Sequence, residues 1–144
     1  MSETLADPPA STANVWYWLR PRADSPAMAR RLLREFLPRV SGGELFEEKG
    51  ALVLSELVTN AFVHGTRRDQ LIKMGLEADP DGELLLIWVE DASHEAPQLC
   101  VAAEGEAGRG LLLVDRLSQQ WGWGPREGIG KRVWSCIERG PAVA

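Results

Sequence analysis

The chain of 144 residues is long enough to bury one hydrophobic core and too short for two of ordinary size. Hydrophobic residues make up 44% and charged residues 26%, which argues against a wholly disordered chain, a collagen-like repeat or a disulfide scaffold. A formal net charge of -5 leaves no broad basic surface for phosphates, so no direct nucleic acid partner is expected.

Neither the cysteines nor the apolar segments indicate an exported or membrane protein. Cys100 and Cys136 have no C-x-x-C or Cys/His spacing, which favours reduced thiols over a disulfide framework or a zinc site. The longest apolar run, residues 84–89, is too short to span a bilayer, and the first 13 residues lack the pattern of a signal peptide. We therefore expect a cytoplasmic protein without membrane contact.

The first third of the chain predicts a leader, a strand and a helix. Residues 1–13 are rich in Ala, Pro, Ser and Thr without periodicity, which is typical of a mobile leader. Residues 15–19 are aromatic and predict a strand, which Pro21 ends. A helix then begins near Asp24, with Pro26 in its first turn, and ends around Pro38.

The middle of the chain predicts a long helix and a hairpin. Residues 44–64 have apolar side chains at helical spacing, with Gly65 as a stop signal. Residues 70–78 and 83–90 predict two antiparallel strands, because residues 79–82 (Asp-Pro-Asp-Gly) form a turn sequence.

The last third predicts a long connection, a helix and a second hairpin. Residues 92–107 show no periodicity, and a connection of this length suggests a function. A helix follows from Leu111 to near Gly122. The second hairpin would comprise residues 121–123, a turn at 125–128, and residues 131–138.

These elements predict one domain over residues 14–138, followed by a tail at 139–144. Their order is strand, helix, helix, strand, strand, helix, strand, strand, and the two hairpins require antiparallel pairing. The expected class is α+β, a two-layer sandwich in which helices cover one face of a mixed, mostly antiparallel sheet.

A polar stripe on the central helix is the first candidate site. Glu56, Asn60 and His64 recur at i, i+4 and i+8 and would share one helix face. They could form the solvated face of an amphipathic helix. Alternatively, Asn60 could offer an oxygen ligand to Mg²⁺ while Glu56 orients or deprotonates a nucleophile. His64 could contact a phosphate or cap helix carbonyls.

A carboxylate at the end of the apolar strand is the second candidate. Asp91 follows residues 84–89 and could accept a hydrogen bond from an exocyclic amine at the floor of an apolar pocket. With Ser93 close behind, it could equally belong to a plain turn at the end of a strand.

The third candidate is Gly108-Arg109-Gly110-Leu111 at the opening of a helix. Glycines there let backbone N–H groups approach an anion, and the helix dipole favours negative charge. Many glycine turns before helices are only turns, so the order of all three motifs matters more than this one alone.

The motifs in this order strongly resemble the histidine-kinase-like ATP-binding domain family, with the Bergerat fold, and most closely its small bacterial anti-sigma-factor serine/threonine kinases. The resemblance spans about residues 15–137 and rests on four segments: residues 56–65 with their E-x-x-x-N-A pattern, Asp91-Ala92-Ser93 with Pro97, residues 108–114, and residues 130–134.

The resemblance implies a role for each candidate residue. Asn60 would be the Mg²⁺ ligand, Glu56 the base, Asp91 the acceptor for the adenine amine, and Gly108 to Leu111 the turn that faces the phosphates. Residues 92–107 would form the lid over the nucleotide. Lys131 lies in the last motif, where its side chain could reach a phosphate or face water.

One departure from the family pattern concerns the lid. The wider family has D-x-G-x-G after the adenine-binding Asp, whereas Ser93 and Glu95 occupy the two glycine positions here. This substitution puts lid geometry and turnover in question, while Ser93 remains a candidate contact to the nucleotide. The charges of Glu95, Glu104 and Glu106 would oppose a triphosphate, so we expect them to face solvent.

The leading expectation is an ATP- and Mg²⁺-dependent kinase that binds a sigma factor and phosphorylates an anti-sigma-factor antagonist, with a homodimer as a plausible state. One alternative is a non-catalytic module that acts by protein contact alone, and another is an ATPase that acts on water. The tryptophan pairs Trp16/Trp18 and Trp121/Trp123 indicate sheet core or an interface rather than a base-stacking platform.

Overall fold

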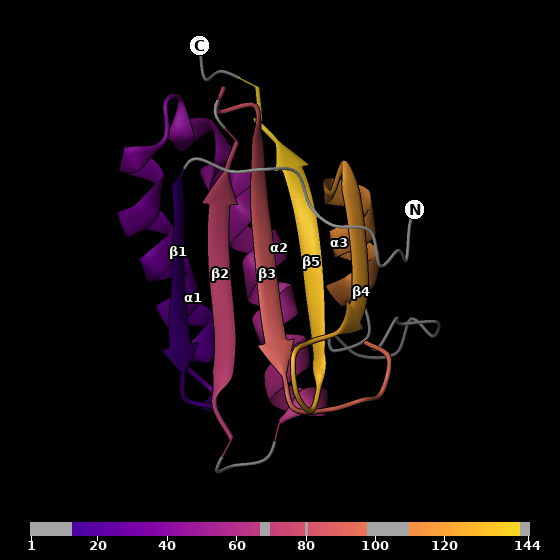
Figure 1. Ribbon diagram of the computed structural model, residues 1–144. Helices are drawn as coiled ribbons and strands as arrows, with labels where there is room; N and C mark the ends of the chain where they lie inside the picture. The colour runs from indigo at the N-terminus through magenta and orange to yellow at the C-terminus, as the bar shows by residue number, and fades with distance from the viewer. Residues whose placement is uncertain (1–12, 67–69, 80, 98–109, 142–144) are drawn as a thin grey trace.

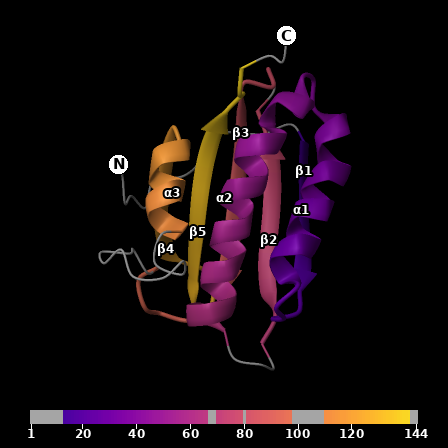
Figure 2. The ribbon, with the colours of Figure 1, turned by 180° about the vertical axis from the view of Figure 1, so that it is seen from behind.

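A computed structural model describes residues 13–66, 70–79, 81–97 and 110–141. Five strands form one sheet, and the described residues include three α-helices. Figures 1 and 2 show that the helices lie side by side on one face of the sheet. The α+β two-layer arrangement predicted from the sequence is confirmed. Within these ranges, no helix is long and apolar enough to cross a membrane.

The strands are paired antiparallel throughout the described sheet. Their order is β1-β2-β3-β5-β4, so the two hairpins β2–β3 and β4–β5 lie beside each other through β3 and β5. The sheet is thus simpler than the mixed one expected. The bounds are Ala13–Leu19 for β1, Ile72–Ala78 for β2, Leu84–Asp91 for β3, Gln120–Pro125 for β4 and Lys131–Glu138 for β5.

The helical layer consists of three α-helices with short helical turns at their ends. α2 lies in the middle of the layer, between α1 and α3 (Figure 2). The bounds are Ser25–Phe36 for α1, Leu37–Arg39 for the 3-10 turn η1, Gly43–Phe46 for the 3-10 turn η2, Glu47–Asn60 for α2, Ala61–Gly65 for the π-helical turn η3 and Gly110–Leu117 for α3.

Two helix predictions need correction. The last helix ends at Leu117 and not near Gly122, because the chain there pairs with β5: Gln119 N donates to Cys136 O at 2.8 Å before β4 begins. The central helix is not uniform up to His64, since its last turn is π-helical. A π turn holds more residues than an α turn, so His64 does not continue the i, i+4 stripe of Glu56 and Asn60.

The ends of the domain also differ slightly from expectation. β1 begins at Ala13, the last residue of the predicted leader, whose other residues lie outside the described ranges. At the other end, Arg139 Nε donates to Gly82 O at 2.6 Å and Gly140 N donates to Leu45 O at 2.6 Å. The first two residues of the predicted tail are therefore hydrogen bonded to the domain.

The main core fills the space between the sheet and the helices. α2 buries Val53, Leu54, Leu57 and Val58 against strand residues such as Ile87. Successive strand residues point to opposite faces, so Leu85, Ile87, Val89 and Asp91 all lie on the helix side of β3. Asp91 is thus at the end of an apolar row that faces α2.

The opposite face of the sheet carries most of the tryptophans. Trp88, Trp134, Leu86 and Cys136 form a small buried cluster there. Next to it, Trp16 and Trp18 on the edge strand β1 are 53% and 52% exposed, and Lys73 Nζ lies 4.5 Å from the Trp16 ring centroid. The Trp16/Trp18 pair is therefore not core, whereas Trp121 on β4 is.

Because Cys136 is buried, we expect its thiol to react slowly with alkylating reagents. Burial raises the pKa of its thiol to about 11, from an ordinary value of 9.0. Only the thiolate attacks an alkylating reagent, so at pH 8 we expect folded Cys100→Ser protein to react with iodoacetamide at Cys136 about 100-fold more slowly than the same protein in urea. Mass spectrometry of timed aliquots measures both rates, and equal rates would contradict the buried position.

Candidate functional site

The candidate site lies where the end of β3 meets the start of β5. Asp91 is the last residue of β3 and pairs in register with Lys131, the first residue of β5. Both side chains belong to the helix side of the sheet by strand alternation. They are almost completely buried, with Asp91 2% and Lys131 3% exposed.

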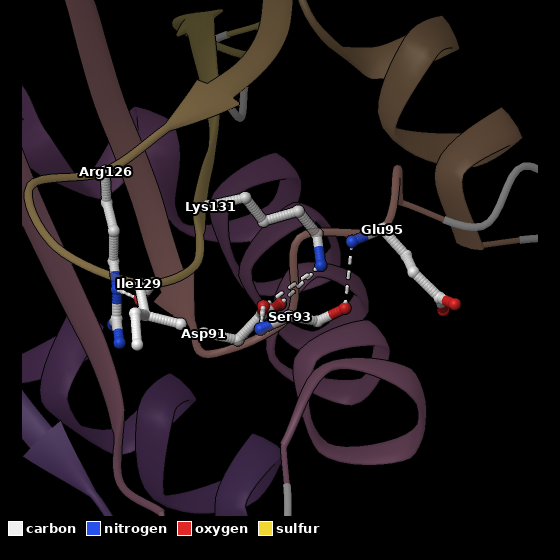
Figure 3. A network of polar contacts seen from close by, with 6 residues as sticks. All are labelled: Asp91, Ser93, Glu95, Arg126, Ile129 and Lys131. Atoms are coloured by element: carbon white, nitrogen blue, oxygen red, sulfur yellow. Dashed lines mark hydrogen bonds and ion pairs between the residues drawn. The ribbon is translucent and has the colours of Figure 1, made fainter.

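Lys131 donates to both oxygens of the Asp91 carboxylate. Its Nζ lies 3.0 Å from Oδ1 and 2.9 Å from Oδ2, as Figure 3 shows. The sequence left open whether this ammonium reaches a phosphate or faces water. It does not face water, because Lys131 is 3% exposed and its ammonium lies against the Asp91 carboxylate. The buried carboxylate needs such a charged partner inside the protein.

The electrostatics of Asp91 reflect burial more than charge. Loss of solvent raises the pKa of its carboxyl above the ordinary value of 3.8. The hydrogen bonds from Lys131 and Ser93, together with the positive charges of Lys131 and Arg126, act in the opposite direction. Lys131 therefore stabilises the ionised carboxylate of Asp91, which accepts hydrogen bonds and donates none.

The chain after Asp91 forms a compact turn. Ser93 N donates to Asp91 Oδ1 at 2.8 Å, and Ser93 Oγ accepts from Glu95 N at 3.0 Å (Figure 3). Side chains thus close a turn at the positions where the wider family pattern has glycines. Glu95 is exposed, as expected from its charge. Its predicted companions Glu104 and Glu106 lie outside the described residues.

Two glycines that were not predicted as site residues allow the backbone to approach Asp91 closely. A Cβ at Gly65 would lie 2.2 Å from Asp91 Oδ2, so only glycine lets the end of the central helix approach the carboxylate. Gly130 has a φ of +121°, and a Cβ there would lie 2.0 Å from Asp91 O. The helix stop at Gly65 and the glycines before Lys131 were the signals for both.

Thr66, also missed from the sequence, adds an unsatisfied polar atom next to Gly65. Its hydroxyl oxygen is buried and has no hydrogen-bond partner among the groups of the described chain. Because a buried hydroxyl without a partner is costly and rare, it is a candidate for contact with a bound molecule.

The helix residues predicted from the sequence occupy different environments. Asn60, the last residue of α2, is buried at 8% exposure, and Glu56 one turn earlier is partly buried; both have polar partners within the protein. His64 in η3 is exposed. Since Gly65 lies against Asp91, the helix end that carries Asn60 leads directly to the carboxylate.

The glycine motif is described only in part. Gly108 and Arg109 lie outside the described residues, and Gly110 is the first residue of α3. Leu111 is 1% exposed and packs in the core. The Leu111 side chain therefore anchors the helix, which leaves its backbone N–H as the group for any ligand contact.

The comparison with protein families identifies the family of this chain. The model described as "Histidine kinase-like ATPase domain" matches residues 19–135. The chain belongs to this family. The match runs from the end of β1 into β5 and so includes every candidate site residue named above.

A search of solved structures supports the fold of this ATPase domain. It is similar to a chain described as "The crystal structure of the RsbU and RsbW domains of Rv1364c from Mycobacterium tuberculosis", with a TM-score of 0.66 and 19% sequence identity. The similarity covers 89% of this chain and 33% of that chain, so this chain spans about a third of that protein's length. A search of curated proteins found no significant match.

Proposed function

We propose that this ATPase-family domain binds ATP with Mg²⁺ and transfers the terminal phosphoryl group to a serine or threonine of a partner protein. One observation carries the proposal: at the position where the family motif has its adenine-binding Asp, Asp91 is buried, charge-compensated and aligned with the end of the central helix. A buried carboxylate at a strand end is suited to accept from an amine.

The residues present fit such a ligand. Asp91 would hold the amine of the base, and the unsatisfied hydroxyl of Thr66 offers a further polar contact. Asn60 would offer its amide oxygen to Mg²⁺, which commonly takes few protein ligands and completes its shell with water and phosphate oxygens. In the described chain, no three His, Cys, Asp or Glu side chains gather as a metal site, which is compatible with that mode.

The remaining groups would act on the phosphates and the acceptor. Bound ATP with Mg²⁺ supplies the transferable phosphoryl group and the charge compensation for it. Glu56 would accept the proton of the acceptor hydroxyl, because it lies one helical turn before Asn60 on the same helix. Ser93, His64 and the backbone of residues 108–111 are proposed as further nucleotide contacts, whereas Lys131 acts through Asp91.

We further propose that the acceptor is an anti-sigma-factor antagonist, that the domain also binds a sigma factor, and that it works in the cytoplasm, as a homodimer. The motif resemblance described above supports these partners. The similarity to a structure with RsbU and RsbW domains is consistent with a regulatory protein.

The turn after Asp91 favours a second candidate, a module that holds nucleotide, or none, and acts by protein contact alone. Side chains of Ser93 and Asp91 close this turn, in place of the glycine pattern of the wider family. Transfer of labelled γ-phosphate to a candidate antagonist separates the two. Phosphate release without any protein acceptor would instead support an ATPase that acts on water.

Calorimetric titration with ATP and ADP, with and without Mg²⁺, tests the proposed function first. We expect one saturable site with micromolar affinity that strengthens when Mg²⁺ is added. Absence of binding to either nucleotide, in protein shown by circular dichroism to be folded, would overturn the proposed function and leave the contact-only module.

A further inference from the structure

The hydrogen-bond capacity of Asp91 is largely used inside the protein. An ionised carboxylate has about four acceptor positions, two on each oxygen. Oδ1 accepts from Lys131 Nζ at 3.0 Å and from Ser93 N at 2.8 Å, while Oδ2 accepts from Lys131 Nζ at 2.9 Å. Within the described chain, one acceptor position is therefore left, and it belongs to Oδ2.

The orientation of this carboxylate is fixed. Lys131 contacts both oxygens, both side chains are 3% exposed, and the Ser93 amide fills the second acceptor position of Oδ1 (Figure 3). Gly65 packs directly against the carboxylate, since a Cβ there would lie only 2.2 Å from Oδ2, and this contact also holds the group in place. Rotating the carboxylate so that both of its oxygens face a ligand would break the buried ion pair with Lys131, which is costly.

We infer that Lys131 determines base selectivity: by occupying one acceptor position on each oxygen of Asp91, it restricts the carboxylate to a single further donor and so favours adenine over guanine. Adenine offers one exocyclic amine next to a ring nitrogen that accepts. Guanine offers two adjacent donors, the ring N1–H and the 2-amino group, which a carboxylate receives with both oxygens. This inference rests on the proposed binding of a nucleotide at Asp91.

The alternative assignment gives Lys131 a direct contact to the nucleotide phosphates. Two of the three donors of its ammonium already contact the carboxylate oxygens, and Lys131 is 3% exposed, so reaching a phosphate would require the ammonium to move away from Asp91. An uncompensated buried carboxylate would then remain at 2% exposure. The positioning role keeps the ion pair intact.

Calorimetric affinities of ADP and GDP test the inference in the wild type and in Lys131→Met, at pH 8. We expect the wild type to bind ADP at least about tenfold more tightly than GDP, as one unsatisfied buried donor predicts. In Lys131→Met, the two freed acceptor positions should reduce this preference by about tenfold or more.

Arg126→Met is the matched control. Arg126 also places positive charge near Asp91, but its Nε donates to Ile129 O at 2.6 Å and not to the carboxylate. This variant removes a charge while the acceptor positions of Asp91 stay occupied. We expect its ADP-to-GDP preference to remain within about twofold of the wild type.

The outcomes separate the inference from the proposed function. Wild-type protein that binds ADP and GDP equally, or GDP more tightly, overturns the inference even if Lys131→Met does not fold. An unchanged preference in folded Lys131→Met, or the same loss in Arg126→Met, also overturns it. In these cases ADP binding still stands, whereas wild-type protein that binds neither nucleotide overturns both the inference and the proposed function.

Discussion

Replacing Glu56 with Gln is expected to lower phosphoryl transfer by about 100- to 10,000-fold, the range for loss of a general base. ADP affinity should stay within about threefold of the wild type, because the substitution keeps the shape of the side chain and leaves Asp91 and Asn60 untouched. Transfer of labelled γ-phosphate to the proposed antagonist measures the first quantity, and calorimetry measures the second.

Glu48→Gln is the matched control on the same helix. Glu48 lies two turns before Glu56 near the start of α2, where it is exposed, so its substitution removes the same charge without touching the site. We expect transfer within about twofold of the wild type. Full transfer by Glu56→Gln would remove the base role from this residue, and equal losses in both variants would indicate a general charge effect.

Replacing Asn60 with Ala is expected to remove the Mg²⁺ dependence of nucleotide binding. The amide oxygen is the hard ligand that Mg²⁺ prefers, and Ala offers none. In the presence of Mg²⁺, ATP affinity should fall by about tenfold or more, to the level measured in EDTA, while the affinity in EDTA stays nearly constant. Calorimetry in matched buffers with and without the metal measures both.

Asn60→Asp distinguishes loss of a ligand from loss of structure. Asn60 is 8% exposed and has polar partners, so Asn60→Ala also costs stability, which urea unfolding measures separately. Asp keeps an oxygen of the same geometry, so the Mg²⁺ effect on ATP binding should persist. Metal-independent binding by folded Asn60→Asp, or an undiminished metal effect in Asn60→Ala, would show that the ion is held by other groups.

Most of the architecture follows from local signals in the sequence. The turn at residues 79–82 and the alternating or continuous apolar runs beside it predict the β2–β3 hairpin, and the apolar face of residues 44–64 predicts the central helix. The helix end that was misplaced, Leu117, depends on the pairing of Gln119 with Cys136, a contact across 17 residues of chain. Local propensity carries no information about such a contact.

The candidate site was predictable in part because its residue types lie in ordered motifs. Glu56, Asn60 and Asp91 stand out as polar groups in strongly apolar segments, and a buried polar group requires a partner or a ligand. Gly65 and Gly130 were recognised only as a stop signal and as part of a motif. Their role depends on how closely two backbones approach Asp91, which is a property of packing.

The sequence by itself determined the α+β class and which polar residues are candidates for a nucleotide site, because periodicity and motif order can be read from residues close together in the chain. The tertiary structure decided what Lys131 does. Asp91 and Lys131 are 40 residues apart, and only the antiparallel register of β3 and β5 brings the ammonium to the carboxylate. Because both groups are buried, water cannot solvate either charge, and each charge therefore depends on the other for compensation.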